Sequence, residues 1–195
     1  ISICKKNLII RGQHNYQNLL ATYIVNRLIK SKTKKFIEGI ESFPGLEHRF
    51  EKFEKFKNIS FFNDSKSTNL SSSLGALENL ENVYWIAGGL SKVDGFKGVE
   101  KYLNNVKNIY LFGKDRLKLL KYFKGKEVVK EFNNLNLAFE CAFESALKKK
   151  KNINLLFSPA CASFDQFKNF EERGRKFKLL VKRKILSYKK NGKHS

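Results

Sequence analysis

The feature that most constrains this chain is a regular alternation of short apolar runs with longer amphipathic stretches between residues 59 and 188. The apolar runs are predicted strands: ISFFND (59–64), VYWIAGG (83–89), NIYLFG (108–113), the weaker KEVVKE (126–131) and NINLLFSP (152–159). Helical spacing predicts helices over 69–80, 96–105, 114–123, 135–149 and 165–188. Strands that alternate with helices form βαβ units, so we predict an α/β, Rossmann-like domain with a mostly parallel sheet.

The N-terminal part of the chain follows a different pattern. The predicted elements there are an edge strand and two helices, over 6–12, 14–29 and 32–42. Pro44 and Gly45 then interrupt regular structure. We therefore predict two domains, residues 1–42 and residues 43–195.

The composition predicts a folded, positively charged protein. Hydrophobic residues make up 42% of the 195 residues and include 18 Phe, which is enough for a core. The formal net charge of +21 fits an anionic partner such as nucleic acid, acidic lipid or a phosphorylated substrate. We favour the alternative, a compositional bias of the whole chain, because Lys outnumbers Arg and because Asn, Ile and Phe are abundant throughout.

Membrane, secretion and metal-binding signals are absent from the sequence. No apolar run reaches the roughly 18 residues of a membrane-spanning helix, and the N-terminus lacks a signal-peptide pattern. Cys4, Cys141 and Cys161 form neither a CxxC pair nor a metal-ligand spacing, so we expect a reduced, cytoplasmic setting and no metal site. The sequence has no Met, and we expect it to be an internal or trimmed piece of a longer protein.

One polar motif, NDSKSTN (63–69), lies where a predicted strand meets a helix. Ligands of such sheets bind at the carboxyl ends of the strands, and a helix N-terminus attracts anions. Lys66 adds a cation there, Thr68 and two serines add hydroxyl groups, and Asp64 could accept from a ribose hydroxyl or bias a metal. An ordinary capped helix explains the same residues equally well.

Three further motifs lie at turns, each with a structural alternative. In GGLSK, Lys92 could meet a carboxylate or phosphate, or be a surface lysine after a tight turn. In HNYQN, Asn15 and Asn18 share a helix face and could read a purine edge, or Asn15 could simply cap the helix. In GLEHR, Arg49 could clamp phosphates or form an interdomain salt bridge.

The stretch SPACASFDQFKNFEERG (158–174) places small residues and a cysteine between a strand and a charged helix. As a nucleophile, Cys161 would need a histidine partner, and nothing in the sequence ties His14, His48 or His194 to it. The chain has no G-x-x-x-x-G-K-[ST] phosphate loop and no G-x-G-x-x-G dinucleotide signature.

Taken together, the motifs GQHNYQN, FPGLEHRFE, FNDSKSTN, AGG followed by a lysine, and SPACASFDQFKNFEERG resemble those of the Mur ligases, in the same order and at similar spacing. The resemblance runs from about residue 7 to residue 186 and is most specific for the members that add D-glutamate. Those proteins have three domains. The resemblance implies the tail of the central ATPase α/β domain followed by a complete C-terminal Rossmann-like domain.

The resemblance also implies a reaction. D-glutamate is joined to UDP-N-acetylmuramoyl-L-alanine in cytoplasmic peptidoglycan precursor synthesis, with ATP and Mg²⁺ as cofactors. The precursor carboxylate is activated as an acyl phosphate, and the amine of D-glutamate attacks it to form an amide. The full-length protein is expected to be a monomer, with no specific nucleic-acid or membrane partner.

Residue roles follow from the same resemblance. Asn15 and Asn18 match residues near the adenine, Arg49 an arginine at the phosphates, and Asp64 the carboxylate on the ribose. The residues that match the D-glutamate site are Lys66, Thr68, Lys92, Ser163 and Phe170. Of these residues, Lys66 and Arg49 are the predicted catalytic ones.

The chain also departs from the family pattern. Leu90 and Ser91 stand where an acidic residue or glycine is common, and Arg175 replaces a usual acidic residue. In the family the UDP-binding domain, the phosphate loop and the Mg²⁺ ligands, including a modified lysine, lie upstream. We therefore expect no ligase activity from this chain alone.

Three alternatives stay open. The first is a related ligase that adds another amino acid, or glutamyl units to folate. The second is a non-catalytic basic fragment that binds nucleic acid with strong salt dependence. The third is a degenerate or split gene product without activity.

Overall fold

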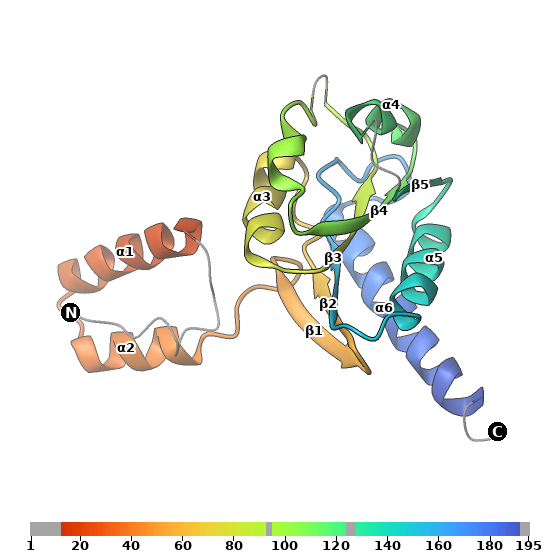
Figure 1. The fold of residues 1–195 in the computed structure, drawn as a ribbon. Helices are drawn as coiled ribbons and strands as arrows, with labels where there is room; N and C mark the ends of the chain where they lie inside the picture. Colours follow the sequence, from red (N-terminus) through yellow and green to blue (C-terminus); the bar gives the residue numbers. More distant parts are fainter. Residues whose placement is uncertain (1–12, 93–94, 124–127, 192–195) are drawn as a thin grey trace. The chain divides into compact units, whose positions relative to one another are not determined.

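The computed structural model describes residues 13–92, 95–123 and 128–191, so the strand predicted over 6–12 lies outside the described residues. The chain divides into two compact units, one that ends at Leu46 and one that begins at Glu47. Figure 1 shows both units.

The first unit is a pair of helices, α1 (Gln13–Leu28) and α2 (Thr33–Ser42). Their facing side chains form a small apolar cluster of Tyr16, Leu19, Tyr23, Phe36, Ile37 and Ile40. The ring centroids of Tyr23 and Phe36 lie 5.5 Å apart. Both helices were predicted from apolar spacing within about one residue of their ends, and the prediction is confirmed.

The second unit contains a six-stranded sheet in the order β1-β2-β6-β3-β4-β5. Its strands are β1 (Glu51–Phe56), β2 (Ile59–Asn63), β3 (Val83–Gly88), β4 (Val106–Phe112), β5 (Val129–Phe132) and β6 (Ile153–Phe157). Every neighbouring pair is parallel except β1 and β2, which are antiparallel. The predicted α/β fold with a mostly parallel sheet is therefore confirmed.

Helices cover both faces of this sheet (Figure 1). On one face α5 (Leu135–Leu147) and α6 (Phe170–Asn191) pack on alternate strand residues such as Phe61, Ile86 and Phe157. The other face packs against α3 (Leu70–Asn79) and α4 (Arg116–Leu120). Two short 3₁₀ helices, η2 (Val99–Tyr102) and η3 (Lys121–Phe123), cover the same face. Burial on both faces explains why the strands are continuously apolar.

The helix predicted over 114–123 is the five-residue α4 followed by the 3₁₀ helix η3. Three further elements differ more strongly from the predictions. Strand β1 was missed because Phe53 and Phe56 are three residues apart, and a register shift between Lys52 and Glu54 breaks the alternation. The helix predicted over 96–105 is only the short η2, which starts after Gly98 in a left-handed conformation (φ 81°).

Helix α6 is the third difference, because it begins at Phe170 and not at 165. The Asn169 side chain accepts a hydrogen bond from the Glu172 N–H at 2.7 Å, and the Glu172 carboxylate accepts one from the Lys168 N–H at 2.7 Å. These reciprocal bonds satisfy backbone donors at the helix start and set its first residue. The residues before it form a loop.

Candidate functional site

The carboxyl ends of β2, β6, β3 and β4 are neighbours in the sheet, so the four loops that follow these strands meet at one edge. The loops after β3 and β6 pair directly, because Leu90 and Ala162 exchange two backbone hydrogen bonds of 3.0 Å. The Asp115 N–H, after β4, donates to the Gly89 carbonyl at 3.2 Å. Topology thus brings three of the predicted motifs, NDSKSTN, GGLSK and SPACASFDQFKNFEERG, to one edge of the sheet, which is the candidate site.

The glycines after β3 are required by this close approach of backbones. Gly89 has φ 131°, and a Cβ added there would lie 2.3 Å from the Ala162 carbonyl oxygen. Gly88 has φ 137°, and its Cβ would lie 2.0 Å from the Phe112 carbonyl oxygen. Because glycine has no Cβ, these two positions allow the neighbouring backbone segments to approach closely at this edge.

Asp64 lies at the base of the site and is 6% exposed. One carboxylate oxygen accepts from the Phe50 N–H at 3.0 Å. The other accepts from the hydroxyls of Ser67 and Ser158, each at 2.6 Å. The carboxylate therefore joins the loop after β2 to the loop after β6. Its predicted contact with a ribose stays a prediction.

Arg173, in the first turn of α6, is fully buried. Its Nε and Nη2 donate to the hydroxyl and the carbonyl of Ser65, at 3.0 Å and 2.7 Å. Its Nη1 donates to the Cys161 carbonyl at 2.9 Å. Burial lowers the pKa of Arg173 to about 10, which still leaves it charged near neutral pH. One guanidinium thus clamps α6 to the loops after β2 and β6.

A second buried contact joins the segment before β1 to the same helix. His48 Nδ1 lies 2.9 Å from the Asn63 amide nitrogen, which also donates to the Gly174 carbonyl at 3.3 Å. If the amide donates to Nδ1, the neutral ring carries its proton on Nε2. Desolvation lowers the pKa of His48, and it outweighs the opposing carboxylates of Glu47 and Glu51.

Glu47, His48 and Glu51 bring possible metal ligands within 4.8 Å of one another. Lys178 Nζ already bridges the two carboxylates, at 2.9 Å from Glu47 and 2.6 Å from Glu51. Burial alone would lower the pKa of Lys178, but the two carboxylates outweigh it and raise that pKa. The cluster is an ion-pair network with an ammonium at its centre.

The predicted D-glutamate residues lie in the segments that follow β2, β3 and β6. Lys66 and Thr68 follow β2 and are partly buried, and Lys92 follows β3 and is exposed. Ser163 follows β6 and is only 2% exposed. Its carbonyl accepts hydrogen bonds from the N–H groups of Gln166 and Phe167. Phe170 opens α6, and Lys66 Nζ lies 4.0 Å from its ring centroid.

The predicted ATP residues are divided between the two units. Asn15 and Asn18 lie one turn apart on α1, and Asn18 is exposed. Arg49 is exposed in the second unit, one residue before Phe50, whose N–H bonds Asp64. Within the second unit, the residue after Arg49 is thus hydrogen-bonded to the Asp64 carboxylate.

Cys161 is not placed as a nucleophile. It is 1% exposed, packs in the core on the α3 side of the sheet, and burial raises the pKa of its thiol to about 12. A thiol with so high a pKa is not ionised near neutral pH.

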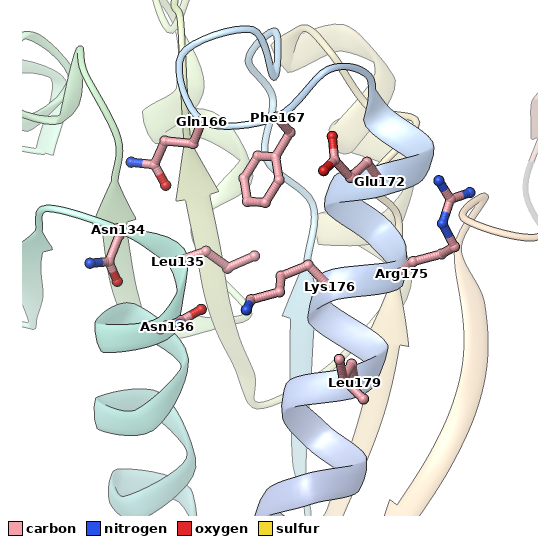
Figure 2. Close-up of a pocket in the computed structure, with 9 residues that line it drawn as sticks. All are labelled: Asn134, Leu135, Asn136, Gln166, Phe167, Glu172, Arg175, Lys176 and Leu179. Atoms are coloured by element: carbon pink, nitrogen blue, oxygen red, sulfur yellow. The ribbon is translucent and has the colours of Figure 1, made fainter.

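The second unit also has an open hollow of about 560 Å³ between the start of α5 and α6. Figure 2 shows Lys176 reaching across it toward α5, whereas Arg175 points away. The lining residues are Asn134, Leu135, Asn136, Gln166, Phe167, Glu172, Arg175, Lys176 and Leu179. None of them is a predicted site residue.

Sequence reasoning missed the buried polar partners at this edge, Arg173 and Ser158. A signal for Arg173 was present, because the buried residues of α6 recur every four positions at 173, 177, 181 and 185. An arginine on an apolar stripe needs internal hydrogen-bond partners. No comparable signal marks Ser158, whose partners Asp64 and Ser73 are distant in sequence.

Among the described residues, no helix combines the length and apolarity needed to cross a membrane. No protein-family model matches the chain. In overall fold it is similar to the UDP-N-acetylmuramate–alanine ligase MurC from Thermotoga maritima, with a TM-score of 0.65 and 19% identity over 92% of this chain and 40% of that one.

Curated relatives are much more similar in sequence. The UDP-N-acetylmuramoylalanine–D-glutamate ligase of Rickettsia prowazekii (strain Madrid E) is 41% identical over 179 residues, which are 91% of this chain and 40% of the relative. The enzyme of the same name from Wolbachia pipientis wMel is 42% identical over 177 residues, 91% of this chain and 34% of the relative. This chain thus spans two fifths or less of these two relatives, and over that span it is a homologue of the UDP-N-acetylmuramoylalanine–D-glutamate ligases of the Mur ligase family.

Proposed function

We propose that this chain is the D-glutamate-binding portion of an ATP-dependent ligase. That ligase would join D-glutamate to UDP-N-acetylmuramoyl-L-alanine in the cytoplasm, through an acyl phosphate. Residues 43–195 would be its C-terminal domain, and residues 1–42 the end of its ATP-binding domain. The observation that carries the proposal is the convergence of Lys66, Thr68, Ser163 and Phe170 at one edge of the sheet.

The chemistry of this edge suits a dianionic amino acid. Lys66 and Lys92 would supply cations for the two carboxylates, and Thr68 would supply a hydroxyl donor. Ser163 would contribute through its hydroxyl, which requires a small opening of the loop because the residue is 2% exposed. Positioning the amine and stabilising developing charge are the main contributions that a protein makes to such a transfer.

In the second unit, Arg49 would contact the phosphates of the nucleotide and Asp64 its ribose; the adenine roles of Asn15 and Asn18, in the first unit, stay predictions. Bound Mg²⁺ would supply charge neutralisation at the phosphates. Among the described residues the one cluster with metal-ligand spacing, Glu47–His48–Glu51, does not fit it. Mg²⁺ prefers six oxygen ligands, whereas this cluster offers an imidazole and is bridged by Lys178.

D-glutamate binding by the 195-residue chain tests the proposal directly. In a nitrogen-15 NMR titration, D-glutamate should shift backbone signals of residues 64–69 and 158–170 more than L-glutamate does. Ser163→Ala should weaken the response. Equal responses to both enantiomers, or shifts confined to other regions, would count against this site.

Catalysis is a separate question, because the sequence contains no phosphate loop. We expect no ATP- and D-glutamate-dependent phosphate release from this chain alone. In a full-length protein that carries these residues, Ser163→Ala should raise the KM for D-glutamate more than the KM for ATP. Turnover by the isolated chain would show that the expected inactivity is wrong.

A further inference from the structure

The ammonium of Lys66 lies over the face of Phe170, 4.0 Å from the ring centroid. Among the described residues no carboxylate forms a salt bridge with it. We infer that Phe170 is a positioning residue, whose ring holds the Lys66 ammonium where it meets a carboxylate of the amino-acid substrate. The inference rests on the proposed D-glutamate site and deepens it.

The backbones on both sides of this contact are held by hydrogen bonds. The Lys66 N–H donates to the His48 carbonyl at 3.0 Å. The neighbouring Ser65 hydroxyl donates to the Phe170 carbonyl at 2.8 Å, and Arg173 holds the Ser65 carbonyl at 2.7 Å. The backbones of Lys66 and Phe170 are therefore held close together, and the two side chains meet from them.

A second lysine–aromatic pair in the same unit differs from this one because its aromatic partner is a tyrosine with a hydroxyl group. Lys57 Nζ lies 4.2 Å from the Tyr188 ring centroid, but it also donates to the Tyr188 hydroxyl at 2.9 Å. Phe170 has no hydroxyl, so it holds Lys66 through the ring face alone. A cation within about 6 Å of an aromatic centroid is attracted by the negative face of the ring.

This kind of support suits a substrate-binding lysine. A carboxylate partner would neutralise the ammonium and compete with an anionic substrate, whereas a ring face leaves the full positive charge available. Lysine also has a long flexible stem, and ordering it before binding reduces the entropy lost when the substrate arrives.

The contact is tested first without any substrate. In the 195-residue chain with carbon-13-labelled lysine, the Hε signals of Lys66 should show an upfield ring-current shift. Lys66→Gln assigns the signal by removing it. Phe170→Leu should abolish the shift, while Phe164→Leu, at an aromatic residue that is 72% exposed, should leave it unchanged. Absence of the shift in the wild-type chain would overturn the contact.

The positioning role is tested with phenylalanines of nearly unchanged size. Introducing mono-, di- and trifluorophenylalanine at position 170 progressively weakens the negative ring face. The Kd for D-glutamate should rise stepwise, by about two- to fivefold in total. In a Lys66→Gln background the same series should have no effect, because the cation is gone. The positioning role is overturned if fluorination leaves the Kd unchanged with Lys66 present, or if it raises the Kd equally in the Lys66→Gln background.

The two proposals fail in different ways. If the wild-type chain shows the ring-current shift but does not bind D-glutamate, the proposed function fails, and the ion–ring contact is structural only, which overturns its positioning role. If D-glutamate binds and the fluorination series is flat, the proposed site survives and the inference about Phe170 does not.

Discussion

The polar residues at the carboxyl edge of the sheet form two layers, one buried and one at least partly exposed to solvent. In the inner layer, defined as His48, Asp64, Ser158 and Arg173, every member is buried and hydrogen-bonded within the protein. In the outer layer, defined as Arg49, Lys66, Thr68 and Lys92, every member is at least partly exposed. The inner layer holds the loops together, and the outer layer carries the charged and hydroxyl groups that we propose contact the ligand.

The difference follows from desolvation. A buried polar group that loses its hydrogen-bond partner destabilises the folded state, so substitutions in the inner layer should lower the free energy of unfolding. An exposed lysine keeps its hydration, and its removal changes the fold little. Substitutions should therefore separate the layers: the inner layer through stability, the outer layer through binding.

The largest effect is expected for Arg173→Met. The change removes three hydrogen bonds and leaves the Ser65 and Cys161 carbonyls without this donor, so the free energy of unfolding should fall by about 3–5 kcal/mol. Urea unfolding followed by fluorescence of Trp85, the single tryptophan and fully buried, measures it. Arg175→Met, on the exposed side of α6, is the control and should change stability by less than about 0.5 kcal/mol. Equal effects would break the comparison.

Gly174→Ala should come next. A Cβ at Gly174 would lie 2.4 Å from Nδ1 of the buried His48 ring, so the ring or the helix must shift. We expect a loss of about 1–3 kcal/mol in the Trp85 transition, despite the better helix propensity of alanine. Gly39→Ala, in α2 with nothing within 4 Å of the new Cβ, is the matched control and should leave that transition unchanged. An unchanged Gly174→Ala variant would show that the packing against His48 is loose.

A smaller effect should appear with pH. Because burial lowers the pKa of His48 in the folded state, the unfolded chain binds the proton more readily. Stability is therefore fully present above the ordinary value of about 6.5 and falls as the pH drops below it, by at most about 1.4 kcal/mol per pH unit. Urea unfolding at pH 7.5 and pH 5.5 checks this. His48→Asn should lose less stability over that interval, and a wild-type chain that gains stability on acidification contradicts the prediction.

The smallest effect on stability is expected in the outer layer. Lys92→Gln should change the free energy of unfolding by less than about 0.5 kcal/mol. It should nevertheless weaken D-glutamate binding about tenfold, because a charge-assisted contact is lost. Lys97→Gln, at another exposed lysine, controls for net charge and should leave the Kd unchanged. A large stability loss in Lys92→Gln would place this lysine in the inner layer.

Much of the fold was accessible from the sequence because helices and buried strands have local periodicities. Residues 135–149 were predicted as a helix, and α5 is observed over Leu135–Leu147. Strand β1 was missed because its register shift hides the alternation. The start of α6 was placed five residues early, since the capping bonds of Asn169 and Glu172 depend on side-chain geometry.

By itself the sequence determined most of the strands and helices, and which loops carry lysines and hydroxyl groups, because these properties depend on neighbouring residues. Only the tertiary structure decided that β6, the last strand in the chain, lies between β2 and β3. That placement lets Phe170 lie beside Lys66 and Arg173 bind the loops after β2 and β6. The reason is physical: strand order and buried hydrogen-bond partners depend on contacts between residues about a hundred positions apart, as between Ser65 and Arg173, and local periodicity carries no record of them.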